Sequence, residues 1–191
     1  MPKLANVFMK LIPLTVIWVI AIYTITVEAN ESVENRNVMV PVIVLDIELL
    51  GDTTVQSMQA NDEMLMAKYS NELRRQLTDE HIFTVLDDHY SLSMIQKQSQ
   101  HQFLHRCNGC ELVLAEKLGA KQVLVPWVFR MSKLIQTMYI EIRDVETGKV
   151  LMHIGRNFRG NTDDGWQHVL NRLVETIKEN NGKHTSGKYA R

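Results

Sequence analysis

The chain has two cysteines, Cys107 and Cys110, separated by Asn108-Gly109. This dipeptide can form a turn that brings the two sulfurs within reach of each other, which predicts a disulfide. A bond closing so short a loop stabilises a fold by only about 2 kcal/mol, so its main effect would be to fix the start of the following helix. We favour this structural role. Thiol-disulfide exchange stays open, because a helix N-terminus favours a thiolate.

His101 and His105 precede the cysteine pair and lie four residues apart, so a helix would place them on one face. With two thiolates they would supply the nitrogen and sulfur ligands of a zinc or copper site. Oxidation of the cysteines removes two of these ligands, so we expect no metal and no other cofactor. Glu111 stands where covalent haem attachment requires a histidine, which excludes that cofactor.

Two carboxylates, Asp46 and Glu48, lie near the end of a run rich in valine and isoleucine. Their spacing predicts that both lie on one face of a strand, near its C-terminal end. Such a pair can act as general acid and base, or bind a cation. It can also accept hydrogen bonds from loop amides or a nearby arginine, and we favour this second interpretation.

The motif Arg159-Gly160-Asn161-Thr162-Asp163 precedes the clearest helical pattern of the chain. It suits a helix-capping turn, and the helix N-terminus could also receive an anion. Capping explains Asp163, whereas Arg159 and Asn161 are better ligand candidates. We assign no catalytic residue. The candidate binding surface combines seven residues: Asp46, Glu48, Asn108, Trp127, Arg159, Asn161 and Asp163.

Hydrophobic periodicity predicts the elements that would position these residues. They are a buried strand over 38–50, a helix capped by Asn61 or Asp62 and running to about Leu77, a strand over 82–86, helices over 91–104 and 111–118, a three-strand meander over 123–154, and a helix capped by Asp163 or Asp164. Pro126 inside the first meander strand indicates an edge or a bulge. The fold class is therefore α/β, a mixed sheet with an antiparallel C-terminal meander and helices packed on it, in about two layers.

The first 29 residues have the pattern of an export signal: Lys3 and Lys10, an apolar run, and small residues before the end at Ala29. The run is nearly long enough to span a membrane, so a retained N-terminal anchor is the alternative. The protein is then periplasmic or secreted, or is anchored to the inner membrane and faces outward.

The remaining chain divides into a polar linker over 30–37, a single domain over 38–180 and a flexible tail over 181–191. Loss of the leader removes two of the 21 basic and one of the 22 acidic residues, which leaves the rest close to neutral. Nucleic acid is therefore excluded as a partner. A membrane is a partner only if the N-terminal segment is retained. We expect another exported protein or a small ligand.

Three motifs taken together carry a resemblance: Val44-Leu45-Asp46-Ile47-Glu48, Cys107-Asn108-Gly109-Cys110, and Arg159 to Asp163 running into Trp166. They resemble a bacterial family of exported proteins known only as a domain of unknown function. The resemblance implies no activity, and implies an accessory role beside periplasmic quinoprotein alcohol dehydrogenase systems.

The order of elements is also similar to the N-terminal domain of the translocation protein TolB and to lipoprotein activators of cell-wall synthases, which bind partners rather than catalyse. We therefore expect a non-enzymatic periplasmic accessory or binding module. The alternative is a thiol-disulfide redox protein that uses Cys107 and Cys110.

Overall fold

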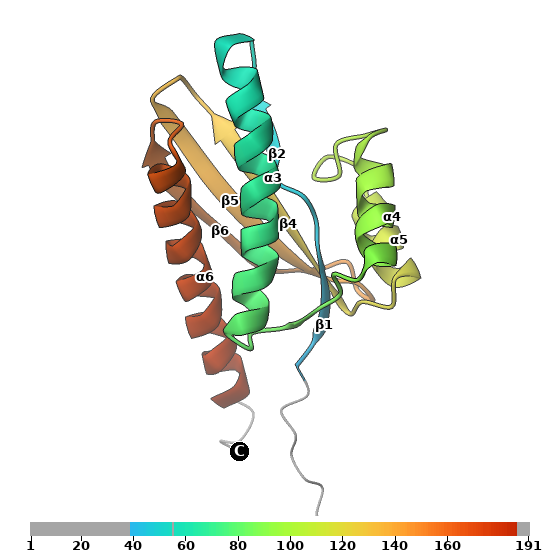
Figure 1. Cartoon of the computed structure of the whole chain (residues 1–191). Coiled ribbons are helices and arrows are strands. Elements are labelled where there is room, and N and C mark those ends of the chain that lie inside the picture. Colours follow the sequence, from blue (N-terminus) through green and yellow to red (C-terminus); the bar gives the residue numbers. More distant parts are fainter. Residues whose placement is uncertain (1–38, 55, 187–191) are drawn as a thin grey trace, which may run out of the picture. The chain divides into compact units, whose positions relative to one another are not determined.

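The computed structural model describes residues 39–54 and 56–186 (Figure 1). From Met39 onward the chain forms one unit. The predicted leader over 1–29 and linker over 30–37 lie outside the described residues, as does the end of the predicted tail. Among the helices in the described part, none combines the length and apolar character needed to cross a membrane.

In the described residues, six strands form one mixed sheet, which confirms the predicted fold class. They are β1 (Pro41–Val44), β2 (Glu48–Gly51), β3 (Thr84–Val85), β4 (Gln122–Arg130), β5 (Ile135–Asp144) and β6 (Val150–Arg159). The central strand β4 pairs in parallel with β1 and β2 on one side and antiparallel with β5 on the other. β3 extends the sheet beyond β1, and β6 completes the predicted meander.

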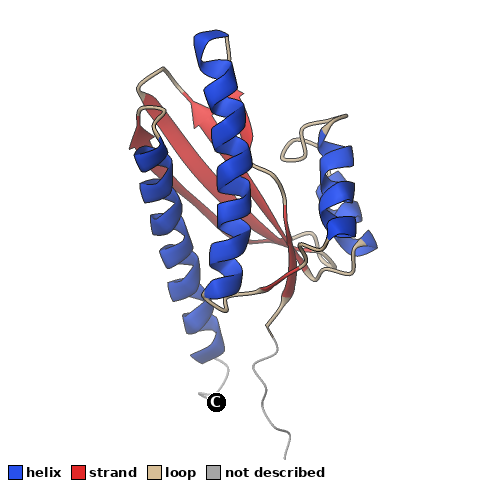
Figure 2. Cartoon of the chain, viewed as in Figure 1, coloured by secondary structure: helices blue, strands red, loops and turns tan. Residues whose placement is uncertain are grey.

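Four helices in the described chain cover both faces of this sheet (Figures 1 and 2). They are α3 (Gln56–Asp79), α4 (His89–Ser99), α5 (Cys110–Lys117) and α6 (Asp163–Ser186). Val42 and Val44 of β1 pack in the cluster with α3 and α6, whereas Ile43 and Leu45 pack in the cluster with α4 and α5. The expectation of two layers was therefore wrong: a first strand buried on both faces needs helices on both.

The strand predicted over 38–50 is interrupted, because β1 and β2 lie end to end along β4 with an irregular segment between them. Leu45 N–H donates to the Leu124 carbonyl at 3.0 Å. In a continuous parallel ladder, the next hydrogen bond would run from the backbone nitrogen of residue 126 to the Leu45 carbonyl. Pro126 has no N–H, so this bond is missing. After this break in the ladder, Ile47 N–H donates to Ser70 Oγ of α3 at 2.9 Å. Pro126 thus lies in the central strand β4 rather than at an edge of the sheet. Its missing N–H separates the neighbouring strand into β1 and β2.

Several helix boundaries differ from the sequence prediction, and three of the differences are large. α3 begins at Gln56, so Asn61 and Asp62 lie inside the helix rather than at its cap. α4 ends at Ser99 instead of continuing to residue 104. α6 continues past position 180, where a tail was predicted, and ends at Ser186.

Candidate binding surface

Four rings from separate parts of the chain form a continuous group on the α4/α5 face of the sheet. We call His105, Trp127, Tyr139 and His153 the aromatic row. The centroid of the Trp127 ring lies 5.8 Å from that of His105 and 5.2 Å from that of Tyr139, with interplanar angles of 27° and 17°. His153 lies 5.6 Å from Trp127 and 5.7 Å from Tyr139. The row therefore runs from the loop before α5 across β4, β5 and β6.

The register of the meander brings these rings together. Trp127 of β4 is paired with Tyr139 of β5, and Tyr139 is paired with Gly155 of β6. A Cβ atom at position 155 would lie 2.6 Å from two ring carbons of Tyr139, so only glycine leaves room for this ring position. Trp127 and Tyr139 are half-buried and His153 is exposed, so the row reaches the surface through β6.

Glu48 holds the loop that precedes the cysteine pair. Its carboxylate accepts hydrogen bonds from the backbone N–H of Leu104 at 2.6 Å and of His105 at 3.3 Å, and it contacts His105 Nδ1. Arg106 Nε donates to His105 Nε2 at 3.0 Å. Because Nε2 accepts, we assign the ring proton to Nδ1, which donates it to Glu48. Glu48 therefore fixes both the loop and the first ring of the row.

Asp46 lies on the other side of the sheet from Glu48. Arg74 of α3 donates from Nη2 to Asp46 Oδ1 at 2.6 Å and also binds the Val44 carbonyl. The expectation that Asp46 and Glu48 share one face was wrong, because the break between β1 and β2 shifts the alternation of side chains. Ile47 accordingly packs in the α3/α6 cluster. The two carboxylates bind separate partners and do not form an acid–base pair.

The motif before α6 also lies on the α3 side. Asn161 donates from Nδ2 to Asp62 Oδ1 at 2.6 Å and accepts from Trp166 Nε1 at 3.1 Å. Asp163 accepts from Lys68 Nζ at 2.5 Å. The capping group of α6 is Thr162, whose Oγ1 accepts from Gly165 N–H at 3.3 Å. The assignment of the cap to Asp163 or Asp164 was therefore wrong: Asp163 is turned toward α3.

The seven predicted surface residues therefore do not converge. Glu48 and Trp127 lie on the α4/α5 face with the cysteine loop, in which Asn108 is exposed. Asp46, Asn161 and Asp163 contact α3 on the opposite face. Arg159 ends β6 and is exposed.

Cys107 and Cys110 form the predicted disulfide, with their Cα atoms 5.5 Å apart. Gly109 is the N-cap of α5, with a positive φ of 97°, and Cys110 is the first helical residue. The carboxylate of Glu111 lies within 4.8 Å of both sulfurs, which makes this the one metal-ligand grouping among the described residues. The disulfide occupies both sulfurs, and both ring nitrogens of His105 are engaged. His101 follows the end of α4, so no helix face joins the two histidines.

A chain of charged groups connects the cysteine loop to the aromatic row. Arg143 of β5 donates from Nη1 to Glu111 at 3.0 Å and from Nε to Glu141 at 2.5 Å. His153 Nδ1 lies 3.1 Å from the other oxygen of Glu141. Neither these residues nor Tyr139 belong to the surface predicted from the sequence. The alternation of β5 places Tyr139, Glu141 and Arg143 on one face, but their partners come from distant segments.

A surface hollow of about 250 Å³ lies away from this row, where α3 meets the start of α4. Its lining includes Arg74, Arg75 and Asp79 of α3, and Asp87 and Leu92. Arg75 Nη1 binds Asp79 at 2.6 Å. The hollow is therefore lined partly by charged groups that neutralise one another.

The family model DUF3280, described as "Protein of unknown function (DUF2380)", matches residues 40–177. The chain belongs to this family. The match runs from the start of the sheet into α6, so it includes the aromatic row and the cysteine pair. No curated protein matches the chain.

Several solved structures are similar to this chain at low identity. The C-terminal domain of LpoB from Salmonella enterica has a TM-score of 0.48 and 15% identity, covering 65% of this chain and 85% of that one. Lipoprotein GNA1162 from Neisseria meningitidis has a TM-score of 0.45 and 14% identity, covering 72% of this chain and 94% of that one. PelC from Paraburkholderia phytofirmans has a TM-score of 0.42 and 15% identity, covering 73% of this chain and 85% of that one.

These structural neighbours are LpoB-like lipoprotein domains rather than the predicted TolB N-terminal domain.

Proposed function

We propose that this protein is an exported, non-enzymatic binding module that contacts a partner protein through the aromatic row. The observation that carries the proposal is the arrangement of rings across β4, β5 and β6. Glu48 fixes one end of the row, and Gly155 makes room for Tyr139. Such a pre-set group of rings loses little conformational entropy on binding.

The surroundings of the row support binding to a protein. Phe103 and Phe129 expose 58% and 39% of their surface, and Leu151 of β6 exposes 50%. Phe129 shares the face of Trp127 because the two residues lie two positions apart on β4. Aromatic residues are enriched in protein interfaces and often supply most of the binding energy.

The charged groups near the row favour binding over acid–base catalysis. Glu48 binds His105, and Glu141 binds Arg143. Each carboxylate thus has an internal cationic or hydrogen-bonding partner, as structural carboxylates normally do. We place the module in the periplasm, delivered by the predicted leader or held by it as an anchor. The family resemblance suggests a partner in a periplasmic quinoprotein alcohol dehydrogenase system.

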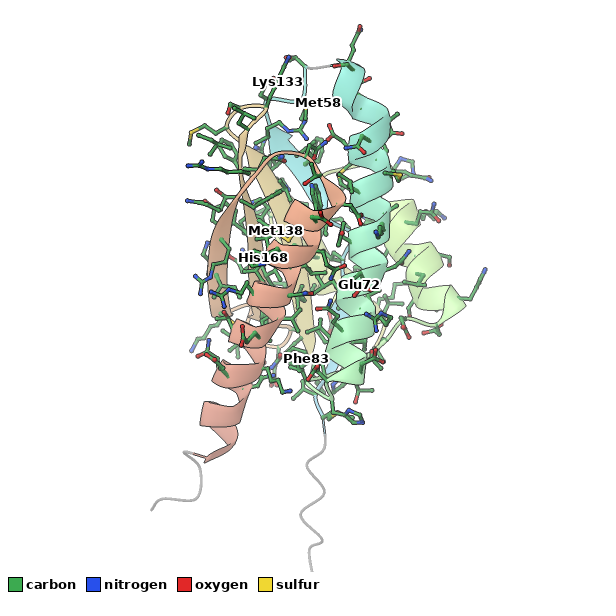
Figure 3. All side chains as sticks on the ribbon, turned by 60° about the vertical axis from the view of Figure 1, so that its left-hand side comes forward. Met58, Glu72, Phe83, Lys133, Met138 and His168 are labelled. Carbon is green, nitrogen blue, oxygen red and sulfur yellow. A yellow bond between two sulfur atoms is a disulfide. The ribbon has the colours of Figure 1, made fainter. Side chains whose placement is uncertain are left out.

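A capture experiment tests this function. Immobilised wild-type protein should retain a partner from periplasmic extract, and the double substitution Tyr139→Ser and His153→Ala should abolish the capture. His168→Ala is the matched control, because His168 is an exposed histidine on α6, on the other face of the sheet (Figure 3). Equal capture by all three proteins would exclude the aromatic row as the contact surface.

A further inference from the structure

Two oxygen atoms converge on the sulfur of Cys107. The Leu104 carbonyl oxygen lies 3.1 Å from Sγ, and Oε2 of Glu111 lies 3.3 Å from it. Both oxygens accept hydrogen bonds, but a disulfide sulfur has no proton to donate. In the dithiol form the Cys107 S–H would supply this missing donor. The surroundings of Cys107 are therefore better matched to a thiol than to a disulfide.

Glu111 is placed to respond to this difference. It is only 3% exposed, and Arg143 Nη1 donates to its Oε1 at 3.0 Å. Within the described part of the chain, Oε2 faces Cys107 Sγ and no N–H or O–H donor. A buried acceptor without a donor is unfavourable. Glu111 therefore favours the reduced state, and it also lies where it can take up the proton of Cys107.

We propose that Cys107 and Cys110 form a reversible thiol-disulfide exchange site in which Glu111 accepts and returns the Cys107 proton. Cys110 is the first residue of α5, where the helix N-terminus favours a thiolate. The Glu111 carboxylate lies within 4.8 Å of both sulfurs, but its close contact at 3.3 Å is with Cys107 Sγ, which the Leu104 carbonyl also contacts. Both contacts favour the protonated thiol at Cys107. Cys110 is therefore the attacking cysteine, and Cys107 closes the disulfide.

The oxidation of the dithiol proceeds in two balanced steps. The Cys110 thiolate attacks a disulfide of the substrate, forming a mixed disulfide and releasing one substrate thiolate. Cys107 then transfers its proton to Glu111 and attacks Cys110 Sγ, which re-forms the Cys107–Cys110 bond and releases the second substrate thiolate. Glu111 gives its proton to that thiolate. The substrate disulfide gains two electrons, which the two cysteines lose. The reverse sequence oxidises a substrate dithiol.

The substrate class is a disulfide or dithiol of another exported protein, since both cysteines are half-buried rather than enclosed. Oxidised and reduced glutathione serve as the probe. In a glutathione redox titration of the full chain, Glu111→Gln should shift the equilibrium toward the protein disulfide about tenfold. A glutamine can direct its oxygen to Arg143 and its NH₂ group to the Leu104 carbonyl, so the disulfide state loses its unpaired acceptor.

Glu116→Gln is the matched control, because Glu116 is exposed on the same helix and should leave the equilibrium unchanged. A second measurement leaves Glu111 intact. With oxidised glutathione, Cys110 in the Cys107→Ser protein should form the mixed disulfide about fivefold faster than Cys107 in the Cys110→Ser protein. A disulfide that glutathione reduces only after unfolding, or equal rates for the two single-cysteine proteins, would overturn the proposal. Both readouts are independent of partner capture.

Discussion

Arg130 of β4 donates to both carboxylate oxygens of Asp62 of α3, with Nη1–Oδ2 and Nη2–Oδ1 distances of 2.8 and 2.5 Å. The two residues are 1% and 5% exposed. Asn161 adds a third hydrogen bond to the same carboxylate. The motif before α6 therefore belongs to a buried polar network that joins α6, α3 and the sheet, which explains the position of Asn161 without a ligand.

The first prediction concerns this network. Asp62→Ala leaves the Arg130 guanidinium buried without its counter-charge and should lower the free energy of unfolding by about 3–5 kcal/mol. Asn161→Ala removes one hydrogen bond to the carboxylate and one from Trp166, and should cost about 1–3 kcal/mol. Urea denaturation measures both values. Arg159→Ala is the control, because its exposed side chain should contribute little. An Asn161→Ala protein as stable as the wild type would contradict this account.

The sequence predicts the sheet class, the meander, the start of α5 and the disulfide, because each depends on local periodicity or on neighbouring residues. It does not reveal that Asp46 and Glu48 separate to opposite faces. That separation depends on Pro126, which lies far away in the chain and lacks the donor that a continuous strand needs. The partners of Asp62 cannot be found from the sequence for the same reason, because they also lie far away in the chain. The local pattern around Arg130 predicts only a strand.

The second prediction tests the contact between Gly155 and Tyr139. Gly155→Ala places a methyl group where two ring carbons of Tyr139 now lie 2.6 Å away, so the ring must move. We expect a loss of about 1–3 kcal/mol in unfolding free energy and a change in the near-ultraviolet circular dichroism, to which the Trp127 and Tyr139 rings contribute. Combining the substitution with Tyr139→Ser removes the clash, so the two costs should not add. If the two losses of unfolding free energy add fully, Gly155 is required by the backbone conformation and not by the position of the Tyr139 ring.

The last prediction concerns acid stability at the start of α6. The hydrogen bond from the Lys68 ammonium, followed by that from the Tyr69 hydroxyl, holds the pKa of Asp163 below its ordinary value of 3.8. A carboxylate with a lowered pKa in the folded state stabilises the fold above its unfolded pKa, and this contribution disappears as the pH falls through the folded pKa. Asp163→Asn should therefore reduce stability at pH 7 and have progressively less effect from about pH 4 downward.

Urea denaturation of wild type and Asp163→Asn between pH 7 and pH 3 measures this difference. Lys68 and Asp163 expose 49% and 55% of their side chains, so salt should also reduce the effect at pH 7. Asp164→Asn is the neighbouring control: it removes the same charge from the same helix turn, but not the hydrogen bonds to α3. If the difference in unfolding free energy between wild type and Asp163→Asn stays constant from pH 7 to pH 3, the charge of the Asp163 carboxylate does not stabilise the fold.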